Sequence, residues 1–309
     1  MRQPAVAGRF YSSNKESLIK EIRNCFTHPI GPGLPGKCRN ERRIVSAIAP
    51  HAGYAASGMN AAHVYKAIAE DGPPEAYVII GPDHHGIPYD VALCGIPYVT
   101  PLGVCGIHEE IAKRLSKEIP DDPPSHRYEH SVEVQVPFIQ FIDPNAKIVP
   151  IIMGDQSEGC ARFLSKAIAE ACEGYDAIVI ASSDLSHYVP KKRAHSESAD
   201  VLKRVCDLDI RGMYNTITER DITACGFGPM AVAMSSGGTN AKLLKYSDSD
   251  DSLGMSNEVV AYASVAFYRE RVPNAATRAA IKEVEAMMKN PSLGKAYNDV
   301  DEMMRELLS

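Results

Sequence analysis

Two histidines follow apolar runs that are typical of buried strands. His51 comes directly after Ile48-Ala49-Pro50, and the pair His84 and His85 comes after Ile79-Ile80-Gly81-Pro82-Asp83. Ligands bind to α/β folds just past the carboxyl ends of strands, and imidazole is the commonest metal ligand. Successive side chains of an extended backbone point to opposite faces, so we expect only one of the adjacent pair to be a ligand.

Cys225 is a third side chain that could bind a metal. It lies in Ala224-Cys225-Gly226, just before the helical run 231–235. A thiol near the N-terminus of a helix tends to have a lowered pKa, which favours the thiolate as a ligand or as a nucleophile. The sequence leaves both roles open. A third possibility is that Cys225 is a small buried residue of the hydrophobic core.

Three further residues are candidates for proton transfer. Asp184 and His187 lie three residues apart, directly after the apolar run 176–181. An imidazole with an ordinary pKa near 6.5 suits a general base, and a nearby carboxylate can orient it; the alternative is that Asp184 caps the following turn. His130, in Glu129-His130-Ser131, could donate a hydrogen bond behind a ligand or cap a helix.

The elements that must position these residues alternate along the chain. Strand-like runs and helical patterns succeed one another from about Arg43 to Arg269, which indicates βαβ units around a largely parallel sheet. The expected strands are 44–49, 76–80, 90–93, 147–152 and 176–181, and the expected helices are 58–69, 109–117, 131–141 and 160–171.

The composition changes after Pro273. The sequence there is charged and rich in Ala, Met and Leu, with helical patterns at Ala275–Lys289 and Leu293–Leu308 broken at Asn290-Pro291. We therefore expect one α/β domain over 1–272 and a helical extension over 273–309. The extension could pack on its own domain or on a second copy, so a homo-oligomer is open.

Charge and hydropathy exclude several classes of protein. The 309 residues include 39 acidic and 33 basic side chains, for a net charge of −6, which does not favour a nucleic-acid partner. No apolar run approaches the roughly 18 residues of a membrane span. The beginning of the chain lacks the apolar core of a secretory signal, and the eight cysteines form no C-x-x-C pair, so we expect a cytoplasmic protein with reduced thiols.

Taken together, six motifs resemble the Memo family, over a stretch from Arg2 to about Arg269. They are Pro4 to Tyr11, Ala49 to Tyr54, Gly81 to His85, Glu129 to Glu133, Ser182 to His187, and Cys225-Gly226. The family is a fold relative of the class III non-haem-iron extradiol dioxygenases, so the resemblance implies a mixed central sheet flanked by helices. It also implies a metal site of His51, His84 and Cys225, lined by Asp184 and by His187 in the place of the dioxygenase base.

The resemblance implies a metal-binding protein with a redox or O₂-related role, acting with O₂ or an unidentified small molecule. Fe²⁺ is the metal that we expect first; because a His₂Cys set is softer than the His₂-carboxylate set of the dioxygenases, copper and zinc are alternatives. Three other functions stay open: an extradiol-type dioxygenase acting on a small aromatic compound, a metal-free hydrolase with Cys225 as nucleophile, and a non-catalytic module for a peptide or protein partner. The last could bind a phosphopeptide through Lys191, Lys192 and Arg193.

Overall fold

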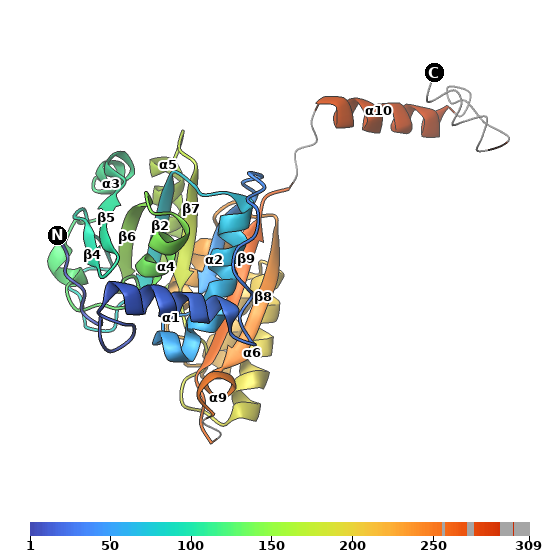
Figure 1. The fold of residues 1–309 in the computed structure, drawn as a ribbon. Helices are drawn as coiled ribbons and strands as arrows, with labels where there is room; N and C mark the ends of the chain where they lie inside the picture. Colours follow the sequence, from blue (N-terminus) through green and yellow to red (C-terminus); the bar gives the residue numbers. More distant parts are fainter. Residues whose placement is uncertain (255–256, 271–274, 291–298, 300–309) are drawn as a thin grey trace. The chain divides into compact units, whose positions relative to one another are not determined.

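A mixed sheet of nine strands forms the centre of the protein in the computed structural model, which describes residues 1–254, 257–270, 275–290 and 299 (Figure 1). The strand order is β4-β5-β6-β2-β7-β1-β9-β8, and β3 pairs with β6. The strands are β1 (Ile44–Ala49), β2 (Ala76–Pro82), β3 (Val91–Leu93), β4 (Tyr98–Thr100), β5 (Gly103–Ile107), β6 (Lys147–Met153), β7 (Ala177–Ser182), β8 (Asn240–Asp248) and β9 (Ala261–Tyr268).

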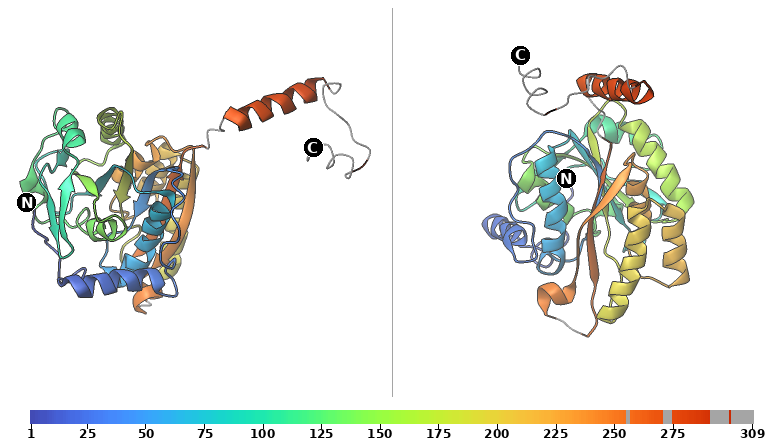
Figure 2. Two further views of the ribbon diagram at one scale, coloured as in Figure 1. Left: turned by 45° about the horizontal axis from the view of Figure 1, so that its top comes forward. Right: turned by 90° about the vertical axis from the view of Figure 1, so that its right-hand side faces the viewer.

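Helices cover both faces of this sheet (Figure 2). The helices α1 (Lys15–Thr27), α2 (Met59–Asp71) and α4 (Gln135–Ile142) pack on one face. On the other lie α5 (Glu158–Ala171), α6 (Lys191–Cys206), α7 (Ile210–Glu219) and α8 (Phe227–Met234). Shorter helical elements are α3 (Glu109–Leu115), α9 (Ser249–Leu253), the π-helical turn η1 (Tyr54–Gly58) and the 3₁₀ turn η2 (Pro123–His126).

Four neighbouring strands at the centre of the sheet are parallel. They are β6, β2, β7 and β1, and β9 then pairs with β1 in the antiparallel direction. All seven residues of β2 are buried, as expected for a strand that is covered by helices on both sides. The predicted α/β class with a mixed sheet is therefore confirmed.

Some predicted boundaries are wrong, and some elements were not predicted. The helix expected from Ser131 begins at Gln135, because residues 129–134 form a turn that bonds back to β2 and to the N-terminal segment. We predicted no individual elements for residues 15–27, 191–219 or 240–268, where four helices (α1, α6, α7 and α9) and two strands (β8 and β9) lie.

The chain divides into two units, Met1–Glu270 and Arg271–Ser309. In the second unit, α10 (Ala275–Lys289) matches the predicted helix, whereas the predicted helix Leu293–Leu308 lies outside the described residues. The boundary at residue 272 stays a prediction. Among the described residues, no helix has both the length and the apolar character that crossing a membrane requires.

The N-terminal segment is fixed by Arg2, which is 4% exposed. Its guanidinium forms an ion pair with Glu133 and donates hydrogen bonds to the carbonyl oxygens of His126 and Glu129, at 3.0 and 2.6 Å. The Glu133 carboxylate also accepts hydrogen bonds from other groups of this segment: the N–H groups of Ala5 and Val6 and the hydroxyl of Tyr11. A buried ion pair stabilises a structure only when its remaining hydrogen-bonding capacity is satisfied, as it is here.

His126 lies beside this ion pair and is fully buried. Its Nε2–H donates to the carbonyl oxygen of Ala92 at 3.0 Å, and its Nδ1 accepts from the Tyr98 hydroxyl at 2.8 Å. Both contacts suit the neutral ring. Burial lowers the pKa of His126 to about 4, and the charge of Arg2 acts in the same direction.

We predict that His126 makes folding sensitive to acid. Its pKa is near 6.5 in the unfolded chain. Between pH 6.5 and pH 4 the unfolded state therefore binds more protons than the folded state, and the free energy of unfolding decreases as the pH is lowered. Lowering the pH from 7.5 to 5 removes on the order of 2 kcal/mol through this residue. Urea unfolding at both pH values should show a smaller pH-dependent loss for His126→Gln than for wild type; equal losses would contradict the prediction.

Candidate metal centre

The structure brings His51, His84 and Cys225 together at the carboxyl ends of the parallel strands. His51 lies two residues past β1, His84 two residues past β2, and Cys225 two residues before α8. In the sheet, β7 lies between β2 and β1, so the histidines approach from either side of its end. One ligand atom of each residue lies within 4.8 Å of the others.

His51 is buried, with both ring nitrogens engaged. Its Nδ1 lies 2.9 Å from the Ser182 hydroxyl, and its Nε2 lies 3.2 Å from Sγ of Cys225. Burial lowers the pKa of His51 well below its usual value, and the neighbouring imidazoles of His130 and His84 lower it further. The ring is therefore neutral at pH 7, which is the form that binds metal ions.

His84 is held from behind by Glu129. The Glu129 carboxylate accepts the backbone N–H of His84 at 2.7 Å and lies 2.9 Å from its Nδ1. A carboxylate with these bonds only accepts, so Nδ1 carries a proton, and in the neutral ring Nε2 keeps a lone pair. Burial tends to raise the pKa of Glu129, but the bonds from His84 and Ser131 outweigh it and hold that pKa well below its usual range. The His84 side chain is 30% exposed, so the centre is open to solvent on this side.

Cys225 is the third candidate ligand of the centre. Its Sγ accepts the Asp184 N–H at 3.2 Å. A Cβ on the next residue, Gly226, would lie 2.5 Å from the carbonyl oxygen of Ser182, so only glycine lets this loop approach β7. The expectation of a lowered thiol pKa is wrong: burial, and then the charge of Asp184, raise the pKa of Cys225. This environment favours the protonated thiol over the thiolate.

Asp184 and His187 lie close to the centre but do not bond to each other through their side chains. Asp184 is buried, which raises the pKa of its carboxyl, and it accepts the backbone N–H of His51 at 2.8 Å. His187 donates its own N–H to Oγ1 of Thr223, and its Nδ1 lies 2.8 Å from the carbonyl oxygen of Thr223. Because that carbonyl only accepts, Nδ1 of His187 carries a proton, and in the neutral ring Nε2 keeps a lone pair. Thr223, rather than Asp184, orients the candidate base.

His130 packs against both candidate imidazole ligands. Its ring stacks on that of His84 with centroids 4.7 Å apart, and meets His51 edge-on at 5.4 Å. With His84 and Glu129 it forms a second, overlapping group of metal-competent side chains. Burial lowers the pKa of His130 to about 4. His85 is exposed and belongs to neither group.

Sequence reasoning missed the roles of Glu129, Ser182 and Gln135, which hold the candidate ligands from behind. It also missed Thr223, which orients the candidate base His187. Ser182 stood only at the start of a family motif, and Gln135 only within a predicted helix. A usable signal existed for Ser182 and Gln135, because each is a polar residue directly beside an apolar run. The structure buries both side chains almost fully. Buried polar groups need partners, so such positions indicate a hydrogen-bond network.

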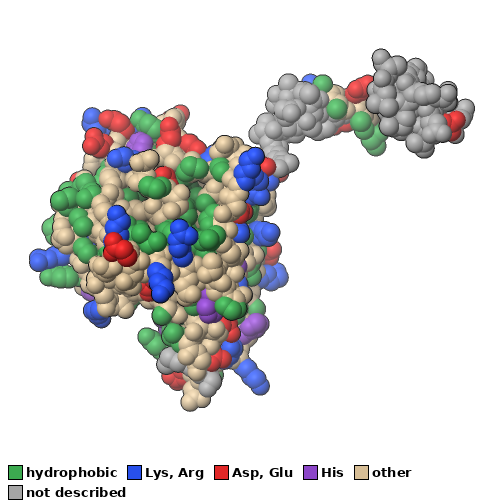
Figure 3. Space-filling model, viewed as in Figure 1, with side chains coloured by type: hydrophobic (Ala, Val, Ile, Leu, Met, Phe, Trp, Pro, Cys, Tyr) green, Lys and Arg blue, Asp and Glu red, His purple; other side chains and the backbone are tan. Residues whose placement is uncertain are grey.

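The basic run after Tyr188 is largely neutralised within the protein. Lys191 donates to Asp250 at 2.8 Å and to Asp251 at 3.2 Å, and Arg193 pairs with Glu197. Figure 3 shows acidic and basic side chains interspersed over one face of the molecule.

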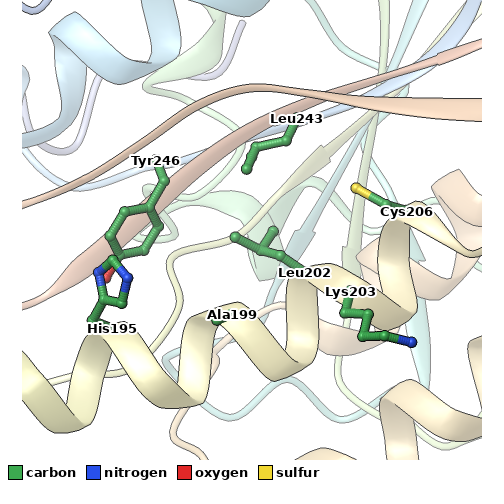
Figure 4. Close-up of a pocket in the computed structure, with 7 residues that line it drawn as sticks. All are labelled: His195, Ala199, Leu202, Lys203, Cys206, Leu243 and Tyr246. Atoms are coloured by element: carbon green, nitrogen blue, oxygen red, sulfur yellow. The ribbon is translucent and has the colours of Figure 1, made fainter.

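A separate apolar pocket of about 370 Å³ lies between α6 and β8 (Figure 4). In Figure 4 the amine of Lys203 points away from it, while the rings of His195 and Tyr246 lie side by side at one end. These rings meet edge-on with centroids 5.3 Å apart. None of the lining residues belongs to the two groups of metal-competent side chains found among the described residues.

The donor set at the centre fits a transition metal. Two imidazole nitrogens and one sulfur converge, and ligands around a tetrahedral ion lie about 3.5 Å apart, which is close to the 3.2 Å between His51 and Cys225. Among the described residues this group offers three protein ligands, and His84 lies on its solvent-exposed side.

Comparison with known proteins gives a consistent result. The model of the family described as Memo-like protein matches residues 2–266. A MEMO1 family protein of Caldivirga maquilingensis is 40% identical over 280 residues, covering 87% of this chain and 99% of its own. One from Sulfurisphaera tokodaii is 41% identical over 282 residues, covering 86% and 99%.

A solved structure of an uncharacterized Escherichia coli K12 protein aligns with 73% of this chain and all of its own, at 11% identity and a TM-score of 0.47. That likeness is too remote to bear on function. The family match, by contrast, extends over nearly the whole first unit, and the two relatives cover 87% and 86% of the chain. The chain belongs to the Memo family.

Proposed function

We propose that this Memo family protein binds one iron or copper ion through His51, His84 and Cys225 and uses it in a redox or O₂-related reaction. The observation that carries the proposal is the convergence of two imidazole nitrogens on one thiol within 4.8 Å. A bound iron or copper ion would supply one-electron redox chemistry and Lewis acidity.

The protein's own residues supply orientation and proton transfer. Glu129 fixes the ring of His84, and the Asp184 carboxylate fixes the backbone of His51. Nε2 of His187 can take a proton from a hydroxyl group of a small molecule that enters from the His84 side. The same free lone pair favours the extradiol-type dioxygenase as the second candidate function, because a catechol must lose a proton before it reacts.

Metal-free catalysis by Cys225 fits the structure less well. A cysteine nucleophile needs a stabilised thiolate, whereas burial and Asp184 raise the pKa of this thiol. The imidazole in contact with Sγ is that of His51 and not that of the expected base, His187. The phosphopeptide alternative is also weakened, because Lys191 and Arg193 already have carboxylate partners.

We predict about one equivalent of iron or copper in protein purified anaerobically from cells supplied with iron, copper and zinc. The Cys225→Ser and His51→Ala variants should lose most of it, because each removes one of three ligands. Cys206→Ser, which changes a cysteine in the apolar pocket, is the matched control and should keep its metal. Elemental analysis of folded protein decides: unchanged stoichiometry in the two ligand variants would refute the site, and zinc alone would refute the redox role.

We predict that Glu129→Gln weakens metal binding by about 10- to 100-fold, as is typical when the partner of a ligating histidine is changed. The amide lacks the negative charge that fixes Nδ1–H of His84. Glu197→Gln changes another buried carboxylate, one that bonds to Ser186 and Arg193, and should have no effect. Titration with Fe²⁺ under anaerobic conditions measures both; equal affinities for the two variants would contradict this role of Glu129.

We predict that iron-loaded protein consumes O₂ in the presence of ascorbate, and that Cys225→Ser does so more slowly after equal loading, because the thiolate tunes the ion. An oxygen electrode measures the rate, with free Fe²⁺ as the reference. Uptake no different from free Fe²⁺ would count against a redox role. Ring-cleaved products from added catechols, lost in His187→Gln, would favour the dioxygenase instead.

A further inference from the structure

A buried hydrogen-bond network behind His51 centres on the hydroxyl of Ser182, the last residue of β7. Its oxygen lies 2.6 Å from the carbonyl oxygen of Ser131, 2.7 Å from Nε2 of Gln135 and 2.9 Å from Nδ1 of His51. A serine hydroxyl has one proton to donate and two lone pairs. The three contacts therefore use its whole hydrogen-bonding capacity.

Carbonyl groups set the direction of two of these bonds, because a carbonyl oxygen only accepts. The hydroxyl proton must point to Ser131. The Gln135 amide nitrogen is identified by its second bond, to the carbonyl oxygen of Pro50 at 2.9 Å, and its Oε1 accepts from the Tyr65 hydroxyl at 2.5 Å. Gln135 therefore donates its other N–H to Ser182.

His51 is left with one compatible state. Since the hydroxyl proton points to Ser131 and Gln135 occupies one lone pair, Nδ1 of His51 must donate to the other. A neutral imidazole has a single N–H, so its lone pair is on Nε2, the atom 3.2 Å from Cys225.

We propose that Ser182, directed by Gln135, is a positioning residue that holds His51 in the tautomer that presents Nε2 to the candidate metal centre. The effect on metal binding rests on the proposed function, whereas the tautomer itself does not. The two imidazoles are then oriented by different chemistry. A carboxylate holds His84, and an uncharged hydroxyl holds His51, which adds no second negative charge behind the centre.

The tautomer of His51 in metal-free protein at pH 7.5 is the primary test. Long-range ¹H–¹⁵N spectra distinguish protonated from unprotonated ring nitrogens, and the spectrum of His51→Gln identifies the His51 signals. We expect wild type to show protonated Nδ1 and unprotonated Nε2. Ser182→Ala should show a mixture of tautomers, together with a Co²⁺ affinity about 10- to 100-fold lower. Gln135→Met, which leaves β7 unchanged, should shift the tautomer in the same direction.

Ser46→Ala is the matched control, because Ser46 is a buried serine in the neighbouring strand β1. Within the described part of the chain its hydroxyl bonds to the carbonyl oxygen of Ala233 alone. This variant should leave both readouts unchanged. A proton on Nε2 of His51 in wild type would overturn the inference, as would a Ser182→Ala variant with the wild-type tautomer. If wild type binds no Co²⁺, the proposed function loses support, while the tautomer still decides the role of Ser182.

Discussion

The central constraint on this structure is that polar groups at the ends of the parallel strands are removed from water and must bond to one another. The strands β2, β7 and β1 end side by side, and helices cover both faces of the sheet. A buried polar group without a partner costs roughly 1–3 kcal/mol. The side chains of Ser182, Gln135 and Glu129 satisfy these groups, and in doing so they fix the rings of His51 and His84.

The N-terminal segment adds further hydrogen bonds to the residues that precede α4. Arg2 bonds to the carbonyl oxygens of His126 and Glu129, and Glu133 accepts hydrogen bonds from Val6 and Tyr11. The turn that carries Glu129 and His130 is thus held from both ends. Phe10 contacts the ring of His130 with centroids 4.9 Å apart, so the first motif of the sequence packs directly against the candidate centre.

Electrostatics at the centre favour a cation. Burial keeps His51 and His130 neutral by lowering the pKa of each ring, whereas Glu129 stays ionised because its hydrogen bonds hold its pKa low. Burial, and then the charge of Asp184, raise the pKa of Cys225. A metal ion would balance the carboxylates and stabilise the thiolate, so the environment that disfavours a free nucleophile favours a ligand.

The sequence by itself determined the α/β class and most of the central strands, and it named His51, His84 and Cys225 as candidate ligands, which the structure brings together. The class and the strands follow from local patterns of apolar side chains, and the candidate ligands from residue type and from motifs. Only the tertiary structure decided what each side chain bonds to. His51 and Cys225 are 174 residues apart in the chain, and Gln135 reaches Ser182 across 47. The thiol pKa, the orientation of His187 by Thr223 and the tautomer of His51 depend on such distant contacts and on burial, which no local pattern contains.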